Sequence, residues 1–268
     1  MNRKTNGTTK KETKAKKQKQ PKMTKQEIEQ KYGNIKIPTG YKLVFNPLTE
    51  MQEIYFNTIM EKRVTVCTGV AGSGKSFVCL SAELQLLKED KGYHKILIVT
   101  PTVEAGNMEL GFLKGSKEDK VQPYLDADFS TINDILEMSG NIPELYMKQL
   151  TEKNMIQGDI VNFMRGKTIK NTIVIITEAE NFNKQELFLL LSRMHPTSKY
   201  IINGDNRQQD RKDIKNTQKN GLAYAMQTLK GEIDEIGFCH FTRKDIVRDP
   251  LIGKIMDCWF GDEDMDEY

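Results

Sequence analysis

The sequence predicts an α/β domain with a mainly parallel β-sheet and helices on both of its faces. Short apolar segments alternate with helical segments along the chain, and the segments 96–99 and 173–176 are apolar without interruption. A strand that is apolar on both faces is typical of the centre of a parallel sheet covered on both sides. We therefore expect one three-layer domain over residues 40–260.

The elements expected for this fold follow from local signals. After Pro47, Thr49 and Gln52 have the spacing of a capping box, which predicts a helix over 50–60. Asn183 and Glu186 have the same spacing before a later helix. Further strands are expected at 63–67, 95–100, 172–176, 199–203 and 235–241. Further helices are expected at 75–89, 118–126, 131–139, 144–153, 221–230 and beyond Pro250, with loops over 106–115.

Composition excludes several classes of protein. The 268 residues are 38% hydrophobic and 29% charged, and the longest apolar runs are only a few residues long. A membrane-spanning helix needs about 20 apolar residues, so we expect no membrane segment. The four cysteines form no Cys-x-x-Cys pair, which argues against a disulfide framework or a zinc site. The first 22 residues have no apolar stretch and therefore do not resemble a secretory signal, so we expect a cytoplasmic protein.

Charge is unevenly distributed. Residues 1–25 hold ten of the 40 basic residues and one of the 37 acidic residues, so the remaining chain has 30 basic and 36 acidic residues. We expect a disordered basic tail over 1–30, because it lacks the apolar residues that a core needs. One interpretation is an arm that holds RNA or DNA, and the other is a solubilising tail. A second tail, over 261–268, is acidic.

The segment Gly69–Ser76 matches the pattern G-x-x-x-x-G-K-[ST] between an expected strand and an expected helix. In such a phosphate loop, glycines let the backbone curl so that its N–H groups point at a phosphate. The lysine, Lys75, reaches the β- and γ-phosphates, and the hydroxyl of Ser76 ligates Mg²⁺.

Polar residues follow the next two apolar strands. After 173–176 come Thr177 and Glu178, where a phosphate-loop nucleotidase usually has Asp and Glu. Glu178 is the expected general base that activates water, and a favourable charge at a helix start is the alternative. Thr177 brings no negative charge to Mg²⁺, so either turnover is slow or a nearby acid such as Asp205 compensates. Asp205 and Gln208 follow the next strand, where they are placed to sense a γ-phosphate.

Together these motifs resemble the PhoH family of ATPases, whose core is similar to that of superfamily 1 helicases. The resemblance covers about residues 42–260, and the compact size with a basic tail resembles phage-encoded members. Nine segments carry it: 69–76, 101–106, 110–115, 120–125, 163–168, 178–179, 204–210, 221–222 and 245–251. The sequence departs from the family pattern at Thr177 (usually Asp), Glu180 (usually Gln) and Thr100 (usually Arg).

The resemblance implies a single RecA-like P-loop NTPase domain that binds ATP with Mg²⁺, and a role on RNA or single-stranded nucleic acid. It implies that Gln52 reads adenine, although an ordinary helix-surface amide is the alternative. The expected catalytic residues are Lys75, Glu178, Gln208 and Arg248. The expected nucleotide-binding residues are Gln52, Gly69, Val70, Ala71, Gly72, Ser73, Gly74, Lys75, Ser76, Phe77 and Asp205, with Ser76 also the metal ligand.

The resemblance makes Arg248 a candidate arginine finger. A tandem helicase supplies its finger from a second RecA-like domain, and this chain has room for one such domain. A finger from another subunit would require a homo-oligomer such as a ring. The alternative for Arg248 is an ion pair within the chain, for instance with Asp245. Basic residues at 165–167, Lys212, Lys215 and Lys219 line a nucleic-acid path or form an ordinary solvated surface.

Three functions remain open on the sequence. The first is an ATPase that moves or remodels RNA, which Glu178, Gln208 and Arg248 favour. The second is a regulatory module that binds ATP with little hydrolysis, which Thr177 favours. The third is a small-molecule kinase with a lid over 104–170, although no arginine-rich lid is visible there.

Overall fold

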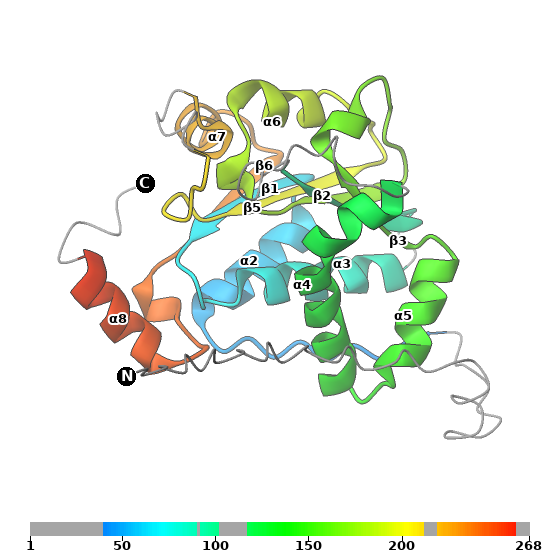
Figure 1. Ribbon diagram of the computed structural model, residues 1–268, viewed down its shortest axis with the longest axis horizontal. Coiled ribbons are helices and arrows are strands. Elements are labelled where there is room, and N and C mark those ends of the chain that lie inside the picture. Colours follow the sequence, from blue (N-terminus) through cyan, green and yellow to red (C-terminus); the bar gives the residue numbers. More distant parts are fainter. Residues whose placement is uncertain (1–39, 90–91, 102–116, 212–218, 261–268) are drawn as a thin grey trace, which may run out of the picture. The chain divides into compact units, whose positions relative to one another are not determined.

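Six parallel strands form the sheet at the centre of the domain (Figure 1), in the order β3-β2-β4-β5-β1-β6. This computed structural model describes residues 40–89, 92–101, 117–211 and 219–260. The strands are β1 (Val64–Gly69), β2 (Lys95–Thr100), β3 (Ile156–Ile160), β4 (Thr172–Ile176), β5 (Lys199–Gly204) and β6 (Ile236–Phe241). Because all neighbours are parallel, their carboxyl ends lie at one edge of the sheet.

The strand order separates β1 from β4 by a single strand, β5. The register pairs Cys67 of β1 with Asn203 of β5, and Ile176 of β4 with Ile202 of β5. The loops after these three strands therefore meet at the carboxyl edge. One strand thus separates the strand before the phosphate loop from the strand that Glu178 follows. RecA-like P-loop NTPases have this arrangement, and it confirms the expected α/β fold.

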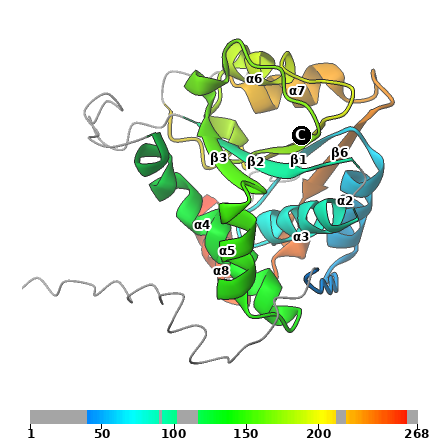
Figure 2. The same cartoon turned by 90° about the vertical axis from the view of Figure 1, so that its right-hand side faces the viewer.

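Helices cover both faces of the sheet, which makes three layers (Figures 1 and 2). On one face lie α2 (Glu50–Glu61), α3 (Lys75–Lys88), α4 (Lys117–Met138) and α5 (Pro143–Glu152). On the other face lie α6 (Lys184–Leu191) and α7 (Gly221–Leu229), and α8 (Pro250–Phe260) ends the described chain. Among the described residues, every helix is too short or too polar to cross a membrane.

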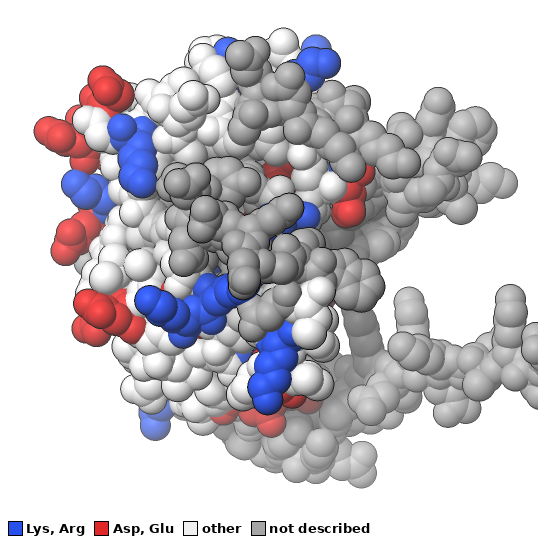
Figure 3. Space-filling view, turned by 90° about the vertical axis from the view of Figure 1, so that its left-hand side faces the viewer, with Lys and Arg blue, Asp and Glu red and all other residues white. Residues whose placement is uncertain are grey.

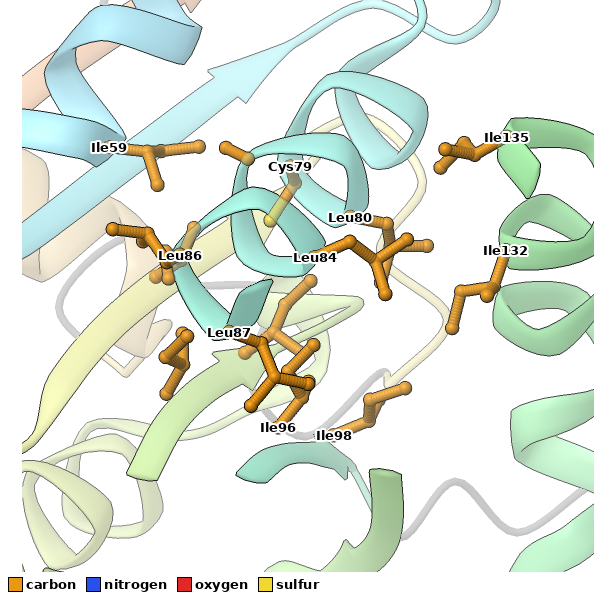
Figure 4. Packing of buried hydrophobic residues seen from close by; sticks show 14 of the residues in the cluster. Ile59, Cys79, Leu80, Leu84, Leu86, Leu87, Ile96, Ile98, Ile132 and Ile135 are labelled. Carbon is orange, nitrogen blue, oxygen red and sulfur yellow. The ribbon is translucent and has the colours of Figure 1, made fainter. Parts of the chain in front are cut away.

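Two buried clusters fill the spaces between these layers. In the first, Leu80 and Leu84 of α3 face Ile132 and Ile135 of α4, while Ile98 of β2 lies beneath α3 (Figure 4). All five side chains are at most 2% exposed. This packing fixes α3, and with it the end of the phosphate loop, against the sheet.

The structure corrects two expectations in the region 104–170. The stretches expected at 118–126 and 131–139 are one continuous helix, α4. The strand β3 was not expected, because Gln157, Gly158 and Asp159 interrupt its apolar pattern. Such a polar pattern fits an edge strand, which pairs with β2 alone.

Other expectations cannot be compared with the structure, because they fall on residues that it does not describe. The chain divides into residues 1–38 and 39–268, and the basic tail expected over 1–30 falls in the first part. The acidic tail over 261–268, the loops over 106–115, Lys212 and Lys215 also lie outside the described residues.

Candidate nucleotide-binding site

The phosphate loop joins β1 to α3 through the turn predicted from the sequence. Gly69, Gly72 and Gly74 have φ angles of 142°, 78° and 83°, a region that residues with a side chain rarely adopt. A Cβ atom on Gly69 would overlap the carbonyl oxygen of Phe241, which accepts a hydrogen bond from the Val70 nitrogen over 3.3 Å. The three glycines and the close contact with β6 therefore hold the curl that main-chain phosphate binding needs.

Lys75 lies over this curl. Its Nζ donates to the carbonyl oxygens of Gly69 and Val70, each over 2.7 Å. Within the loop, the hydroxyl of the buried Ser73 donates to the Val70 carbonyl over 2.8 Å. The ammonium group is thus held against the loop, where its charge can attract an anion.

The start of α3 adds a second cationic feature. Its N-cap is Gly74, which supplies no side-chain cap. Within the described part of the chain, the N–H groups of the first turn therefore have no intrahelical or side-chain acceptor, and the helix dipole makes this end partly positive. Ser76 is exposed in this turn, so its hydroxyl is accessible to a metal ion. Phe77 packs its ring against the core, so its main chain is the part that faces the loop.

Gln52 supports the phosphate loop from α2. The side chain is 5% exposed; its Nε2 donates to the Ser73 carbonyl over 3.0 Å and its Oε1 accepts from the Leu48 nitrogen over 2.8 Å. Thr49 caps α2 as expected by accepting from the Gln52 nitrogen, but the reciprocal half of the box is replaced by the bond to Leu48. Gln52 therefore contacts the loop directly, and its reading of adenine stays a prediction.

The segment before α8 also contacts the loop. The main-chain nitrogens of Val247 and Arg248 both donate to the Gly72 carbonyl, over 3.0 and 3.2 Å. The Arg248 side chain is exposed, and among the described residues it forms no ion pair. Asp245 instead accepts from the nitrogen and hydroxyl of Thr242. The ion pair of Arg248 with Asp245, considered above, is therefore absent.

Thr177 and Glu178 lie directly beyond β4. Thr177 is 7% exposed, and its nitrogen donates to the Val99 carbonyl over 3.1 Å. Glu178 is exposed and has left-handed backbone angles, φ 50° and ψ 44°. This conformation is uncommon for a residue other than glycine, and strain of this kind concentrates at active sites.

A hydrogen-bonded network joins the turns after β4 and β5. The buried carboxyl of Glu180 accepts from the Asp205 nitrogen over 2.8 Å. Both Asp205 carboxylate oxygens are bonded, one to the Arg207 nitrogen over 3.1 Å and the other to Nε2 of Gln208 over 2.8 Å. Asp205 and Gln208 thus form one hydrogen-bonded turn beside the loop, and this turn contains the acid named above as one alternative for compensating Thr177.

Burial and nearby charge shift the pKa of several carboxyls in this region. Burial, then the charge of Glu178 and a hydrogen bond to it, raise the pKa of Glu180 to about 9. Burial and Glu178 raise the pKa of Asp128, on α4, to about 7. Burial and Asp128 raise the pKa of Glu83, on α3, well above its usual range. A row of buried acids therefore runs from the core to Glu178, and its members favour the protonated form.

Three of the expected residues, Gly69, Val70 and Asp205, line one small pocket with Thr68, Asn206, Arg207 and His240. Asn206 has both side-chain polar atoms buried without a partner among the described residues. Thr68 bonds Nδ1 of His240, from β6, over 2.8 Å. The sequence did not single out Asn206 or His240, because a lone Asn or His carries no motif and only the sheet register brings β6 beside the loop.

The comparisons with known proteins agree with this geometry. Residues 44–259 match the model of the family described as "PhoH-like protein". The chain belongs to the PhoH-like family. It is 34% identical over 211 residues to a PhoH-like protein of Synechocystis, covering 79% of this chain and 61% of the relative. It is 35% identical over 191 residues to one of Bacillus subtilis, covering 71% and 56%. This PhoH-like chain thus spans about three fifths of those relatives.

Solved structures resemble the PhoH-like chain more distantly. The large terminase of a thermophilic bacteriophage has a TM-score of 0.47 and 10% identity, covering 80% of this chain and 51% of its own. The Pif1 helicase of Candida albicans has a TM-score of 0.39 and 14% identity, covering 80% and 44%.

Proposed function

We propose that this PhoH-like chain binds ATP with Mg²⁺ at the phosphate loop, hydrolyses the ATP, and couples hydrolysis to the binding or remodelling of RNA or single-stranded DNA. One observation carries the proposal: the loop with Lys75, the strained Glu178 and the Asp205–Gln208 turn follow three strands adjacent in the sheet. A phosphate chain bound by the first is therefore within reach of the other two.

The residues fit a nucleotide phosphate. The curled loop offers main-chain N–H groups, Lys75 supplies a full positive charge, and the uncapped start of α3 adds a partial one. These groups are in place before the reaction begins, so they stabilise the charge that develops on the transferring phosphoryl group without reorganising. Asn206, whose amide lacks a partner within the described chain, supplies a further polar contact at the same pocket.

The residues also fit Mg²⁺ bound mainly through phosphates and water. Among the described residues, no group of three His, Cys, Asp or Glu side chains forms a metal site. Mg²⁺ usually keeps several waters and takes few protein ligands, and Ser76 and Thr177 would supply hydroxyls for it. Bound there, Mg²⁺ would neutralise part of the phosphate charge.

Glu178 is the proposed general base. Its exposed carboxylate lies at the carboxyl edge, where it can accept a proton from the attacking water. Glu180 lies two residues further along the chain, and burial, then the charge of Glu178, raise its pKa to about 9. The Asp205 nitrogen donates to the Glu180 carboxyl, which links the segment after Glu178 to the turn with Gln208.

A second function is favoured by Thr177, namely a nucleotide-loaded regulatory module that hydrolyses ATP scarcely at all. A threonine hydroxyl can bond a metal-bound water but brings no charge, which weakens Mg²⁺ binding relative to an aspartate. Each Asp205 oxygen already accepts one hydrogen bond within its own turn, which makes Asp205 a weaker substitute for the missing aspartate.

The position of the Arg248 side chain supports a proposal that the chain forms an oligomer. The exposed side chain lies on the segment that hydrogen-bonds Gly72, so it borders the nucleotide site. We propose that Arg248 acts as an arginine finger toward the site of a neighbouring subunit in a homo-oligomer such as a ring. Localisation in the cytoplasm, of the host if the chain is phage-encoded, completes the proposal.

Steady-state ATP hydrolysis with Mg²⁺, measured with and without single-stranded RNA, tests the function. Turnover that is stimulated by RNA and abolished by Lys75→Ala supports it. ATP binding without turnover above the Lys75→Ala background supports the regulatory module instead. Gly40, outside the site, offers a matched control as Gly40→Ala, because a Cβ there meets no other atom within 4 Å.

A further inference from the structure

A large cavity lies at the free edge of the sheet, beyond β3. Its volume is about 710 Å³, and it reaches Lys95, Ile156 and Thr172, which belong to the amino-terminal ends of β2, β3 and β4. The phosphate loop follows the carboxyl end of β1 instead, and none of its residues lines this cavity. The β3-edge cavity is therefore separate from the nucleotide site.

The charged lining of the β3-edge cavity is mostly basic. Lys95, Lys167 and Lys170 line it with one acid, Asp159. Asp159 pairs with Lys167 over 3.1 Å, and the Asp159 side chain is 5% exposed. The Lys95 ammonium donates to the neutral amide of Gln157 over 3.2 Å. Among the described residues, neither Lys95 nor Lys170 forms an ion pair, so the cavity presents two uncompensated positive charges.

The rest of the lining is apolar, amide or threonine. Leu125 and Phe129 of α4 lie on it with Ile156 of β3. Gly158 of β3 lets α4 approach closely, because a Cβ there would overlap the Leu125 side chain. Three amides, those of Gln122, Asn154 and Gln157, also line the cavity, together with the hydroxyls of Thr151, Thr168 and Thr172. Apolar atoms with a few amides suit a planar base, and uncompensated lysines suit a phosphate.

Size and shape restrict the ligand further. Cavities of about 300–1,000 Å³ enclose ligands of drug size, so this one has room for a nucleotide. A duplex keeps its bases stacked and paired, so only an unpaired nucleotide can place its base in such a cavity. The charged lining of the cavity also differs from the side of the molecule that carries α7 and α8, where the described basic and acidic side chains are interspersed (Figure 3).

We propose that the β3-edge cavity binds an unpaired nucleotide of a single-stranded nucleic acid, with Lys95 and Lys170 at the backbone phosphates and the apolar and amide lining at the base. The inference rests on the proposed function, since it assigns a place to the nucleic acid named there. It also gives a role to the basic segment 165–167, which contributes Lys167 to the cavity.

Fluorescence anisotropy of a labelled single-stranded RNA with the full chain tests this. The double variant Lys95→Ala/Lys170→Ala removes two charges from the cavity, and Lys88→Ala/Lys230→Ala removes two exposed charges elsewhere. We expect the first double variant to weaken RNA binding about tenfold or more. It should also reduce the slope of log K against log salt concentration by roughly 1.4, because each phosphate contact with a single strand contributes about 0.7 to that slope. The control should do neither.

Further measurements separate loss of the site from other causes. ATP turnover without RNA should be unchanged in the cavity variant, and Lys95→Arg/Lys170→Arg should restore RNA binding. Equal weakening by both double variants, or RNA binding by the cavity variant at wild-type strength, would overturn the inference and leave the proposed function standing. A wild-type chain that hydrolyses ATP but binds no single strand would overturn the nucleic-acid part of the function itself.

A free nucleotide shares the chemistry of a nucleotide within a strand, so a competition experiment distinguishes them. We expect uridine monophosphate to displace the labelled RNA only at concentrations far above those at which the unlabelled strand displaces it. Displacement by the two at similar concentrations, lost in Lys95→Ala/Lys170→Ala, would show a free-nucleotide site and contradict the proposal.

Discussion

The carboxyl of Glu180 accepts a hydrogen bond from the main-chain nitrogen of Asp205 over 2.8 Å, which ties the turn after β4 to the turn after β5. The space is tight, because a Cβ on Gly204 would overlap the same carboxyl oxygen. Since its pKa is raised to about 9, Glu180 is neutral at pH 7. A neutral carboxyl has the shape of the glutamine usual at this position in the family, and like it both accepts and donates.

Replacing Glu180 by glutamine should therefore preserve turnover at pH 7, within about twofold of the wild type. The raised pKa means that the wild-type carboxyl stabilises the fold fully below its usual pKa of 4.5, and loses that contribution as the pH rises toward about 9. The stability of Glu180→Gln relative to the wild type should rise over that window, as urea unfolding at several pH values would measure.

Glu180→Ala serves as the contrast. It leaves the Asp205 nitrogen without its acceptor, which costs roughly 1–3 kcal/mol, and it separates the turn after β4 from the turn that carries Gln208. We expect lower stability below pH 4.5, where the wild-type carboxyl contributes fully, and lower turnover. A glutamine variant whose stability follows the wild type across pH 4.5–9 would contradict protonation of Glu180.

Thr177→Asp should restore the charge that the family usually has after β4. We expect turnover to rise by about tenfold and the Mg²⁺ concentration for half-maximal turnover to fall, because a carboxylate binds the metal's water shell more strongly than a hydroxyl does. Kinetics at varied Mg²⁺ would measure both, with Lys75→Ala/Thr177→Asp as background. Unchanged Mg²⁺ dependence would mean that Thr177 does not face the metal.

Arg248→Ala should lower turnover by about 10³-fold, the smaller end of the effect of losing an arginine finger, while ATP binding is retained. Because the finger is proposed to act between subunits, mixing Arg248→Ala with Lys75→Ala chains should restore part of the activity. A mixture no more active than its components would instead place Arg248 at its own phosphate loop, beside Gly72.

Asp128→Asn tests the row of buried acids. Asp128 is 8% exposed, and its pKa is raised from 3.8 to about 7, so ionising it costs on the order of 4 kcal/mol. The wild type should therefore lose stability relative to Asp128→Asn between pH 4 and about 7, and no further above that. Unfolding free energies across this range would measure the loss, with the exposed Asp134→Asn as control, because that variant keeps Asp128 and should behave as the wild type does. An equal loss of stability with rising pH in Asp128→Asn and Asp134→Asn would contradict the prediction.

Local signals predicted the elements whose causes are local. The cap of α6 is one example, because Asn183 and Glu186 form a complete capping box over three residues. The phosphate loop is another, since glycine spacing determines its curl. The strand β3 was missed because its stability comes from pairing with β2 rather than from its own apolar pattern.

The contacts that complete the site join residues far apart in the chain. Glu180 meets Asp205, His240 meets Thr68, and Arg248 meets Gly72 only because the strand order places their elements together. No spacing rule reaches over such separations. The sequence therefore singled out the loop, the proposed base and the candidate finger, but not how they are held.

The central claim is that Glu178 activates water at this phosphate loop. Turnover of Glu178→Gln at saturating ATP and Mg²⁺, measured with ATP affinity, tests it most directly. We predict turnover reduced by about 10²–10⁴-fold with ATP still bound. Turnover equal to that of the wild type would contradict the claim and place the catalysis of hydrolysis on other residues.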